Sequence, residues 1–286
     1  MNILSIQSWV AYGHVGNASA VFPLQRLGAE VWAVNTVQFS NHTGYGSWRG
    51  QVFGADLVSD LVQGIEDRGA LPRCDATLSG YMGDAGIGEA VLDASARVKA
   101  ANPKALYCCD PVIGDVGRGV FVRPGIPEFM RDRAIPAADI ITPNQFELEW
   151  MTGQPVTTLA EAKAAARALQ ARMAPGGPRC VLITSLKVAE TPDDQIEMLA
   201  AEGDQFHRIR TPMLPLSVNG AGDAIAALFL FHRLKTGSAS AALGAAASSI
   251  YGLLRRTSEA SSREILTVAA QDEFVSPSRV FVPEVC

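Results

Sequence analysis

Short strand-like apolar runs alternate with longer stretches of helical spacing along most of the chain. The runs have the length of buried strands and lie at residues 3–7, 31–37, 76–79, 105–109, 140–142 and 181–184. Strands that alternate with helices predict an α/β protein with a largely parallel central sheet. No fixed-period repeat or low-complexity linker divides the chain, so residues 1–286 are expected to form a single domain.

Helix and turn signals complete this pattern. Thr158 and Glu161 form a predicted capping box that opens an alanine-rich helix running to about residue 173. Segments 196–200 and 205–210 flank a Glu-Gly-Asp turn and predict a hairpin, which adds an antiparallel edge to the sheet. Two apolar helices are predicted at 221–235 and 238–255.

Composition narrows the class of protein. Apolar residues make up 48% and charged residues 19%, which is enough apolar material for a large core. The net charge is −5 without a basic block, so the usual electrostatic footprint of a nucleic-acid-binding protein is missing. The longest apolar run, 224–231, is far shorter than the ~20 residues of a membrane-spanning helix. We therefore expect a globular protein with neither nucleic acid nor membrane as partner.

The N-terminal residues and the cysteines indicate a cellular compartment. The first eight residues have no basic segment and no long apolar segment, so they do not resemble a signal peptide. Five scattered cysteines without a CxxC pair are typical of small buried thiols. Both features favour a reducing cytoplasm.

The candidate site follows from the strand ends. In open α/β sheets, ligands bind outside the carboxyl ends of the strands. Five predicted strands end in a small or polar residue: Ser8, Ser79, Asp110, Thr142 and Thr184. These side chains are expected to lie along one edge of the sheet.

Residues 217–223, Ser-Val-Asn-Gly-Ala-Gly-Asp, enter the first of the two apolar helices. Glycines let the backbone approach an anion closely, and a helix N-terminus favours negative charge there. Asp223 could accept a proton from a hydroxyl group as its oxygen attacks a phosphorus held over the glycines. The alternative is an ordinary glycine-rich loop with Asp223 at the helix start, because short glycine motifs are common.

Two acidic clusters follow strands. Asp110 and Asp115 come after strand 105–109 and suit Mg²⁺, although Asp-Pro and Gly-Asp pairs also form turns. Thr142, Asn144 and Glu147 come after strand 140–142, and a helix is predicted to open at residue 143. Glu147 lies one helical turn beyond Asn144, so both could face one site. The alternative for Glu147 is a solvated residue in a first helical turn.

The N-terminal quarter offers groups for a small polar ring. Ser8, Asn17 and the run 35–46 supply hydroxyls, amides and aromatic rings. His42 lies in this run, and its alternative role is that of a loop or core histidine. Neither a Walker A sequence nor a GxGxxG motif follows the first strand, which excludes the usual P-loop and Rossmann interpretations.

The sequence resembles the pyridoxal kinases of the ribokinase-like superfamily. The matching motifs occur in order along nearly the whole chain, at residues 5–8, 13–17, 22–28, 37–45, 79–81, 109–112, 144–147 and 220–223. The last motif is shared across the superfamily, whereas the run from Gln38 to Tyr45 is typical of pyridoxal kinases. The resemblance implies a ribokinase-like three-layer α/β/α sandwich. It also implies ATP-dependent phosphorylation of the 5′-hydroxymethyl group of pyridoxal, with pyridoxine and pyridoxamine as further candidates.

The resemblance also assigns roles to residues. Asp223 is implied as the catalytic base, and the vitamin side is implied to comprise Ser8, Val15, Val37, Phe39, Thr43, Gly44 and Tyr81. Asp110, Asp115, Thr142 and Glu147 are implied to serve the triphosphate, with Asp110, Asp115 and Glu147 near Mg²⁺. The remaining implied ATP contacts are Asn144, Thr184, Ser185, Thr211, Pro212, Met213, Leu214, Gly220, Ala221 and Gly222. A monovalent cation is a further candidate ligand, and a homodimer is the expected assembly.

Two alternatives remain. One is a kinase of the same fold that acts on hydroxymethylpyrimidine or a sugar, which the run 38–45 disfavours. The other is a noncatalytic pyridoxal phosphate carrier, which the intact Gly220, Gly222 and Asp223 disfavour.

Overall fold

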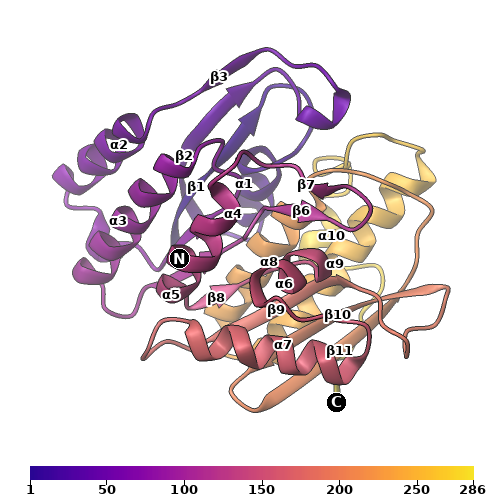
Figure 1. The fold of residues 1–286 in the computed structure, drawn as a ribbon. Helices are drawn as coiled ribbons and strands as arrows, with labels where there is room; N and C mark the ends of the chain where they lie inside the picture. The colour runs from indigo at the N-terminus through magenta and orange to yellow at the C-terminus, as the bar shows by residue number, and fades with distance from the viewer.

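A ten-stranded sheet runs through the centre of the computed structural model, which describes residues 1–286 (Figure 1). Its strand order is β12-β11-β10-β9-β8-β5-β4-β1-β2-β3. The strands are β1 (Asn2–Val10), β2 (Glu30–Phe39), β3 (Gly50–Val52), β4 (Ala76–Ser79), β5 (Leu106–Cys109), β8 (Ile140–Ile141), β9 (Cys180–Leu186), β10 (Gln195–Glu202), β11 (Gln205–Pro212) and β12 (Glu284–Val285). A separate small hairpin consists of β6 (Gly114–Asp115) and β7 (Gly119–Val120).

The pairing confirms the predicted mostly parallel sheet. β2, β1, β4, β5, β8 and β9 are parallel neighbours, and antiparallel strands extend both edges. All six predicted core strands are present, with ends that differ by up to three residues. The predicted hairpin is β10–β11, in which Glu202 pairs with Gln205.

Helices α1 to α10 connect and cover the strands. They are α1 (Asn17–Arg26), α2 (Ala55–Asp67), α3 (Ala85–Ala101), α4 (Ile126–Phe129), α5 (Ile135–Ala137), α6 (Gln145–Thr152), α7 (Leu159–Arg172), α8 (Ala221–Thr236), α9 (Ala239–Glu259) and α10 (Asp272–Val275). Short 3-10 turns occur at Thr43–Tyr45 and Leu71–Arg73, and a π turn at Met130–Ala134 joins α4 to α5. The predicted capping box is confirmed: Thr158 Oγ1 accepts from the Glu161 N–H at 3.2 Å, and the Glu161 carboxylate accepts from the Thr158 N–H at 3.0 Å.

Two apolar layers sandwich the sheet because successive strand residues point to opposite faces. In β5, Tyr107 and Cys109 pack with α2 to α7, whereas Cys108 packs with α1, α8, α9 and α10 on the other face. These layers confirm the expected three-layer α/β/α sandwich. All five cysteines are free thiols, and four of them are buried.

The topology places the site. β1 pairs in parallel with β2 on one side and with β4 on the other, so the chain changes direction across the sheet at this point. The carboxyl ends of strands beside such a switch point leave a crevice for ligands. No helix combines the length and the apolar character needed to cross a membrane.

Candidate active site

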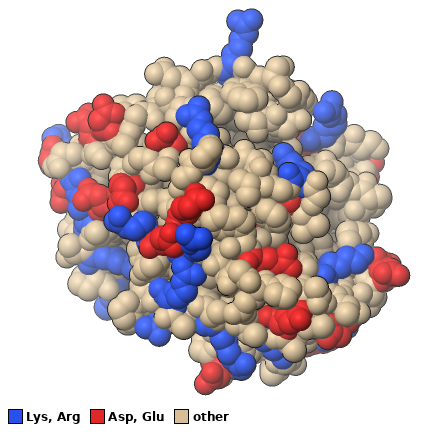
Figure 2. Space-filling model, in the orientation of Figure 1, with Lys and Arg blue, Asp and Glu red and all other residues tan.

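A cleft of about 260 Å³ opens at the carboxyl edge of the sheet. It is lined from both halves of the chain, by β1 and β2 on one side and by the β5, β8 and α8 regions on the other. The cleft brings together most of the predicted site residues: Ser8, Val15, Val37, Phe39, Thr43, Tyr81, Asp110, Asp115, Thr142, Asn144, Glu147, Thr184, Ser185, Gly220, Ala221, Gly222 and Asp223. On the face of the molecule shown in Figure 2, acidic and basic side chains are interspersed.

One side of the cleft is apolar with a buried hydroxyl group. Val10, Val37 and Phe39 form a small buried cluster, against which Val15 and Tyr81 pack. Ser8 is 5% exposed and lies where the β1–β2 register shifts between Gln7 and Trp9. An apolar wall with a few fixed polar groups is typical of a site for a small aromatic ring.

Gly16 connects this wall to the opposite one. Its φ is 55°, and a Cβ there would lie 2.3 Å from both the backbone oxygen and the Oγ of Ser8. The backbone of Gly16 also lowers the pKa of the Asp223 carboxyl group. A residue without a side chain is therefore needed where β1 passes into α1.

The glycine loop forms the N-terminus of α8. Gly220 caps the helix with φ 88°, and no side chain satisfies the first backbone N–H groups. A Cβ on Gly220 would lie 1.8 Å from the backbone oxygen of His14, so only glycine fits. Ser19 in α1 donates to the Gly220 carbonyl at 2.8 Å and anchors the loop. The open N–H groups and the helix dipole suit an anion.

Asp223 lies in the first turn of α8 and lines the same cleft. Burial raises its pKa to about 6, although the backbone groups of Gly16 and of Asp223 itself act in the opposite direction. A carboxylate in this pKa range is ionised near neutral pH and can still accept a proton. The Asp223 side chain therefore reaches the cleft and binds a proton more tightly than an exposed aspartate does.

Asp110 is 6% exposed at the end of β5. Burial and, to a smaller extent, the charge of Asp223 raise its pKa to about 8, although a hydrogen bond from Thr142 acts in the opposite direction. Thr142 Oγ1 donates to Asp110 Oδ1 at 2.9 Å, whereas Asp110 Oδ2 accepts no hydrogen bond. The second oxygen is therefore available to a ligand.

Glu147 is 4% exposed, which contradicts the alternative of a solvated side chain. The helix begins at Gln145 rather than at residue 143, because the Asn144 side chain caps it and completes a capping box with Glu147. Glu147 Oε1 accepts from the N–H groups of Ile113 and Gly114 at 2.9 and 3.4 Å, and Oε2 accepts from Asn144 at 2.9 Å. Burial and the charge of Asp110 raise the pKa of Glu147 despite these bonds.

The β6–β7 hairpin borders the cleft above these carboxylates. Asp115 Oδ1 accepts from the Val116 N–H at 2.8 Å, and Asn144 Nδ2 donates to the Gly114 carbonyl at 2.8 Å. At the hairpin tip, Arg118 Nη1 donates to Asn219 Oδ1 at 3.2 Å. The hairpin is thus attached to α6 at its base and to the glycine loop at its tip.

Some predicted residues lie outside this cleft. Gly44 lines an adjoining pocket with His42, Tyr45, Arg118 and Asn219. Thr211 is buried at the end of β11, and neither it nor the following Pro212, Met213 and Leu214 lines either pocket. Their contact with ATP stays a prediction.

The cleft also includes residues to which the sequence analysis assigned no role, among them Val10, Val112, Phe121 and Val218. Val10 could have been found by extending the alternation of β1 two residues past Ser8. The other three lie in loops, where the sequence has no regular spacing from which the orientation of a side chain could be predicted.

The structure contains no cluster of three or more His, Cys, Asp or Glu side chains that could hold a metal ion by themselves. Mg²⁺ usually takes one or two protein carboxylates, and water and phosphate oxygens complete its octahedron. Asp110 fits this role through its free oxygen, and Asp115 through Oδ2, which accepts no hydrogen bond. Glu147 fits less well because both of its oxygens already accept backbone N–H groups.

Known proteins resemble the chain over its full length. The phosphomethylpyrimidine kinase family model matches residues 71–267. The pyridoxal kinase PdxY of Granulibacter bethesdensis is 69% identical over 286 residues, with 100% of both chains covered. The pyridoxal kinase PdxY of Deinococcus radiodurans is 60% identical over 285 residues, which cover 99% of this chain and 96% of the relative. Among solved structures, pyridoxal kinase from Leishmania donovani in complex with ADP and ginkgotoxin has a TM-score of 0.92 at 30% identity, with 100% of this chain and 99% of that chain covered.

Proposed function

The chain belongs to the pyridoxal kinase family, and we propose that it transfers the γ-phosphoryl group of ATP to the 5′-hydroxymethyl group of pyridoxal. The observation that carries this proposal is that Ser8 and Asp223 line one cleft, in which the Gly16 backbone lies against Ser8 and lowers the pKa of Asp223. An apolar wall suited to a small aromatic ring and a helix N-terminus suited to phosphate therefore lie in the same cleft.

Each wall of the cleft has a proposed role. The apolar wall around Val37 and Phe39 holds the pyridine ring, and the Ser8 and Thr43 hydroxyls bind its polar substituents. The open N–H groups at the start of α8 bind the phosphoryl group that is transferred. This arrangement fixes the two reacting groups in one cleft, which removes much of the entropic barrier.

Asp223 is the proposed base. It takes the proton of the 5′-hydroxyl group as that oxygen forms a bond to the γ-phosphorus, the bond from the γ-phosphorus to the β,γ-bridging oxygen breaks, and ADP leaves. The raised pKa of Asp223, about 6, gives it more proton affinity than an exposed aspartate. The products are pyridoxal 5′-phosphate and ADP.

Asp110 and Asp115 are the proposed ligands of a divalent cation, Mg²⁺. Glu147 holds the backbone at the start of β6, here called the β6 turn (Ile113 and Gly114), beside them. When bound, Mg²⁺ would neutralise charge on the triphosphate. Asp110 at the end of β5 and Asp115 in β6 form no ion pair with a Lys or Arg side chain, so both stay available to the cation. A monovalent cation, a homodimeric assembly and a cytoplasmic location complete the proposal.

The decisive experiment is an ADP-release assay with pyridoxal, pyridoxine, pyridoxamine and hydroxymethylpyrimidine side by side. We expect turnover with pyridoxal, and Asp223→Ala should lower kcat by about 10²–10⁴-fold, the usual contribution of a general base. Preference for hydroxymethylpyrimidine would favour the alternative of the same fold. Pyridoxal binding without ADP release would favour a noncatalytic carrier, and near-normal turnover by Asp223→Ala would exclude Asp223 as the base.

A further inference from the structure

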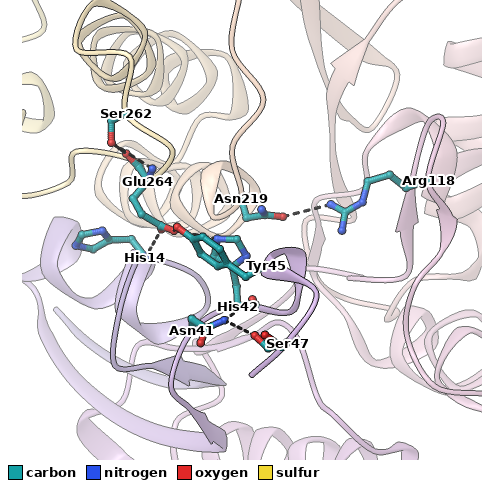
Figure 3. Close-up of polar contacts among 9 residues, drawn as sticks. All are labelled: His14, Asn41, His42, Tyr45, Ser47, Arg118, Asn219, Ser262 and Glu264. Atoms are coloured by element: carbon teal, nitrogen blue, oxygen red, sulfur yellow. Dashed lines mark hydrogen bonds and ion pairs between the residues drawn. The ribbon is translucent and has the colours of Figure 1, made fainter. Parts of the chain in front are cut away.

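One carboxylate from the C-terminal part of the chain reaches the loop on the vitamin side of the cleft. Glu264 follows α9, and its side chain is 12% exposed. It accepts hydrogen bonds from Tyr45 Oη at 2.7 Å, from His42 Nε2 at 3.0 Å and from the His14 N–H at 3.2 Å. Figure 3 shows Glu264 extending from its own segment toward Tyr45 and His42 of the N-terminal loop.

The position of Glu264 is itself fixed locally. Ser262 Oγ donates to the Glu264 carbonyl at 2.6 Å and accepts from the Glu264 N–H at 3.2 Å. Ile265, the next residue, is fully buried against the α8 and α9 layer. The carboxylate is thus presented from a segment attached to the core.

The loop that Glu264 contacts has little packing of its own. None of the three residues of the turn Thr43–Tyr45 is buried. His42 and Tyr45 flank Thr43 and Gly44, and their rings lie 4.6 Å apart between centroids. The guanidinium of Arg263 lies 4.9 Å from the centroid of the Tyr45 ring. A turn without a buried apolar residue depends on polar contacts to stay in one position.

The contact also fixes the orientation of His42. A carboxylate only accepts hydrogen bonds, so the proton that faces Glu264 must be on His42 Nε2. The His42 side chain is 10% exposed and lines the cleft. Its Nδ1 is buried without a hydrogen-bond partner. The hydrogen bond to Glu264 is therefore the one that fixes the orientation of the His42 ring.

We propose that Glu264 is a positioning residue for the vitamin: by binding His42 and Tyr45 it holds Thr43 and its turn against the pyridoxal side of the cleft. The proposal rests on the proposed function, because the turn matters only if that side receives pyridoxal. Glu264 is not a residue of the cleft wall, so its effect must pass through the groups that it binds, of which His42 and Tyr45 contact it through their side chains and His14 only through its backbone. It should therefore change pyridoxal binding and leave ATP binding unchanged.

The test compares Glu264→Ala with Glu259→Gln, which removes an exposed carboxylate at the end of α9. We expect Glu264→Ala to raise the KM for pyridoxal by on the order of tenfold, while the KM for ATP and kcat stay within about twofold. Glu264→Gln should give a smaller rise because Tyr45 and His42 bind the same carboxylate oxygen, and an amide oxygen in its place can still accept from both. Glu259→Gln should behave as wild type.

A double-mutant cycle adds a check on the mechanism. Tyr45→Phe should raise the KM for pyridoxal, and the Glu264→Ala/Tyr45→Phe double variant should be less impaired than the product of the single effects. An unchanged pyridoxal KM in Glu264→Ala, or an equal rise for both substrates, would overturn the proposal. If Glu264→Ala does not fold, Glu264→Gln and Tyr45→Phe decide by the same criteria.

A readout independent of turnover separates this proposal from the proposed function. Hydrogen–deuterium exchange at amides 42–46 should be faster in Glu264→Ala than in wild type, with other segments unchanged. A wild-type chain that releases no ADP with pyridoxal would overturn the proposed function, and unchanged exchange at 42–46 would overturn the loop contact. The two failures are therefore distinguishable.

Discussion

Asp110 and Asp223 line the same cleft, where burial and then the negative charge of Asp223 raise the pKa of Asp110 to about 8. The two carboxyl groups start on different elements, the end of β5 and the first turn of α8. Like charges in one poorly solvated space raise each other's affinity for protons and for cations. A cation bound between the two carboxyl groups would therefore be favoured by the charges of both.

The pH dependence of catalysis should reflect Asp223. Its pKa of about 6 predicts that kcat/KM for pyridoxal rises with pH through about 6, because only the ionised carboxylate can accept the hydroxyl proton. Below this value the rate should fall about tenfold per pH unit. Initial rates at saturating ATP test this, and a flat profile down to pH 5 would contradict it.

The pH dependence of stability should have the opposite direction. Asp110, Glu147 and Asp223 all have raised pKa values, so the folded chain binds more protons than the unfolded chain between about pH 4 and pH 8. Their stabilising contribution is present below the unfolded value and is lost as the pH rises toward 8. The Tm of the ligand-free chain should fall over this range. Asp110→Asn should flatten the fall, whereas Asp204→Asn, in the exposed β10–β11 turn, should leave it unchanged.

Gly220→Ala should lower the stability of the folded chain. The new methyl group would lie 1.8 Å from the His14 carbonyl oxygen, in a backbone conformation with φ 88°. We expect a loss of at least about 1 kcal/mol in the free energy of unfolding, measured by urea titration. Gly222→Ala is the matched control for stability because a Cβ there has no neighbour within 4 Å. Equal stability of the two variants would contradict the steric explanation.

Glu147→Gln should lower the stability of the fold more than Glu161→Gln does, although both residues complete capping boxes. Glu147 is buried and its two oxygens accept three backbone N–H groups, so an amide NH₂ would face a donor. We expect a loss of about 1–3 kcal/mol in the free energy of unfolding for Glu147→Gln and a smaller loss for Glu161→Gln, because the Glu161 side chain is partly exposed. Urea titration of both variants measures the difference. A KM for ATP that rises only in Glu147→Gln would link the β6 turn to the nucleotide.

The parallel core and the glycine loop could be predicted because their signals are local. β1 and β9 are rich in Ile, Leu and Val, and Gly220 to Asp223 precede the uninterrupted apolar run 224–231. The edge strands β3 and β12 could not be found, since short polar segments pair only because a neighbouring strand offers free backbone groups.

The contact between Glu264 and His42 was beyond prediction for a related reason. The two residues are 222 positions apart, and nothing in either segment marks the other as its partner. Only the packing of α1, α8 and α9 on one face of the sheet brings them together. The resemblance to a family suggested which residues line the cleft, but long-range polar contacts required coordinates.

Cys108 and Cys109 are adjacent in the chain but separated by the backbone of the sheet, since each packs into a different apolar layer. Neither can bridge to the other in this conformation, and burial raises the pKa of both, that of Cys109 to about 12. Because thiolates are the reactive form, alkylating reagents should reach this pair only when β5 opens. The rate of their labelling would thus time the opening of the innermost part of the molecule, and bound nucleotide should slow it.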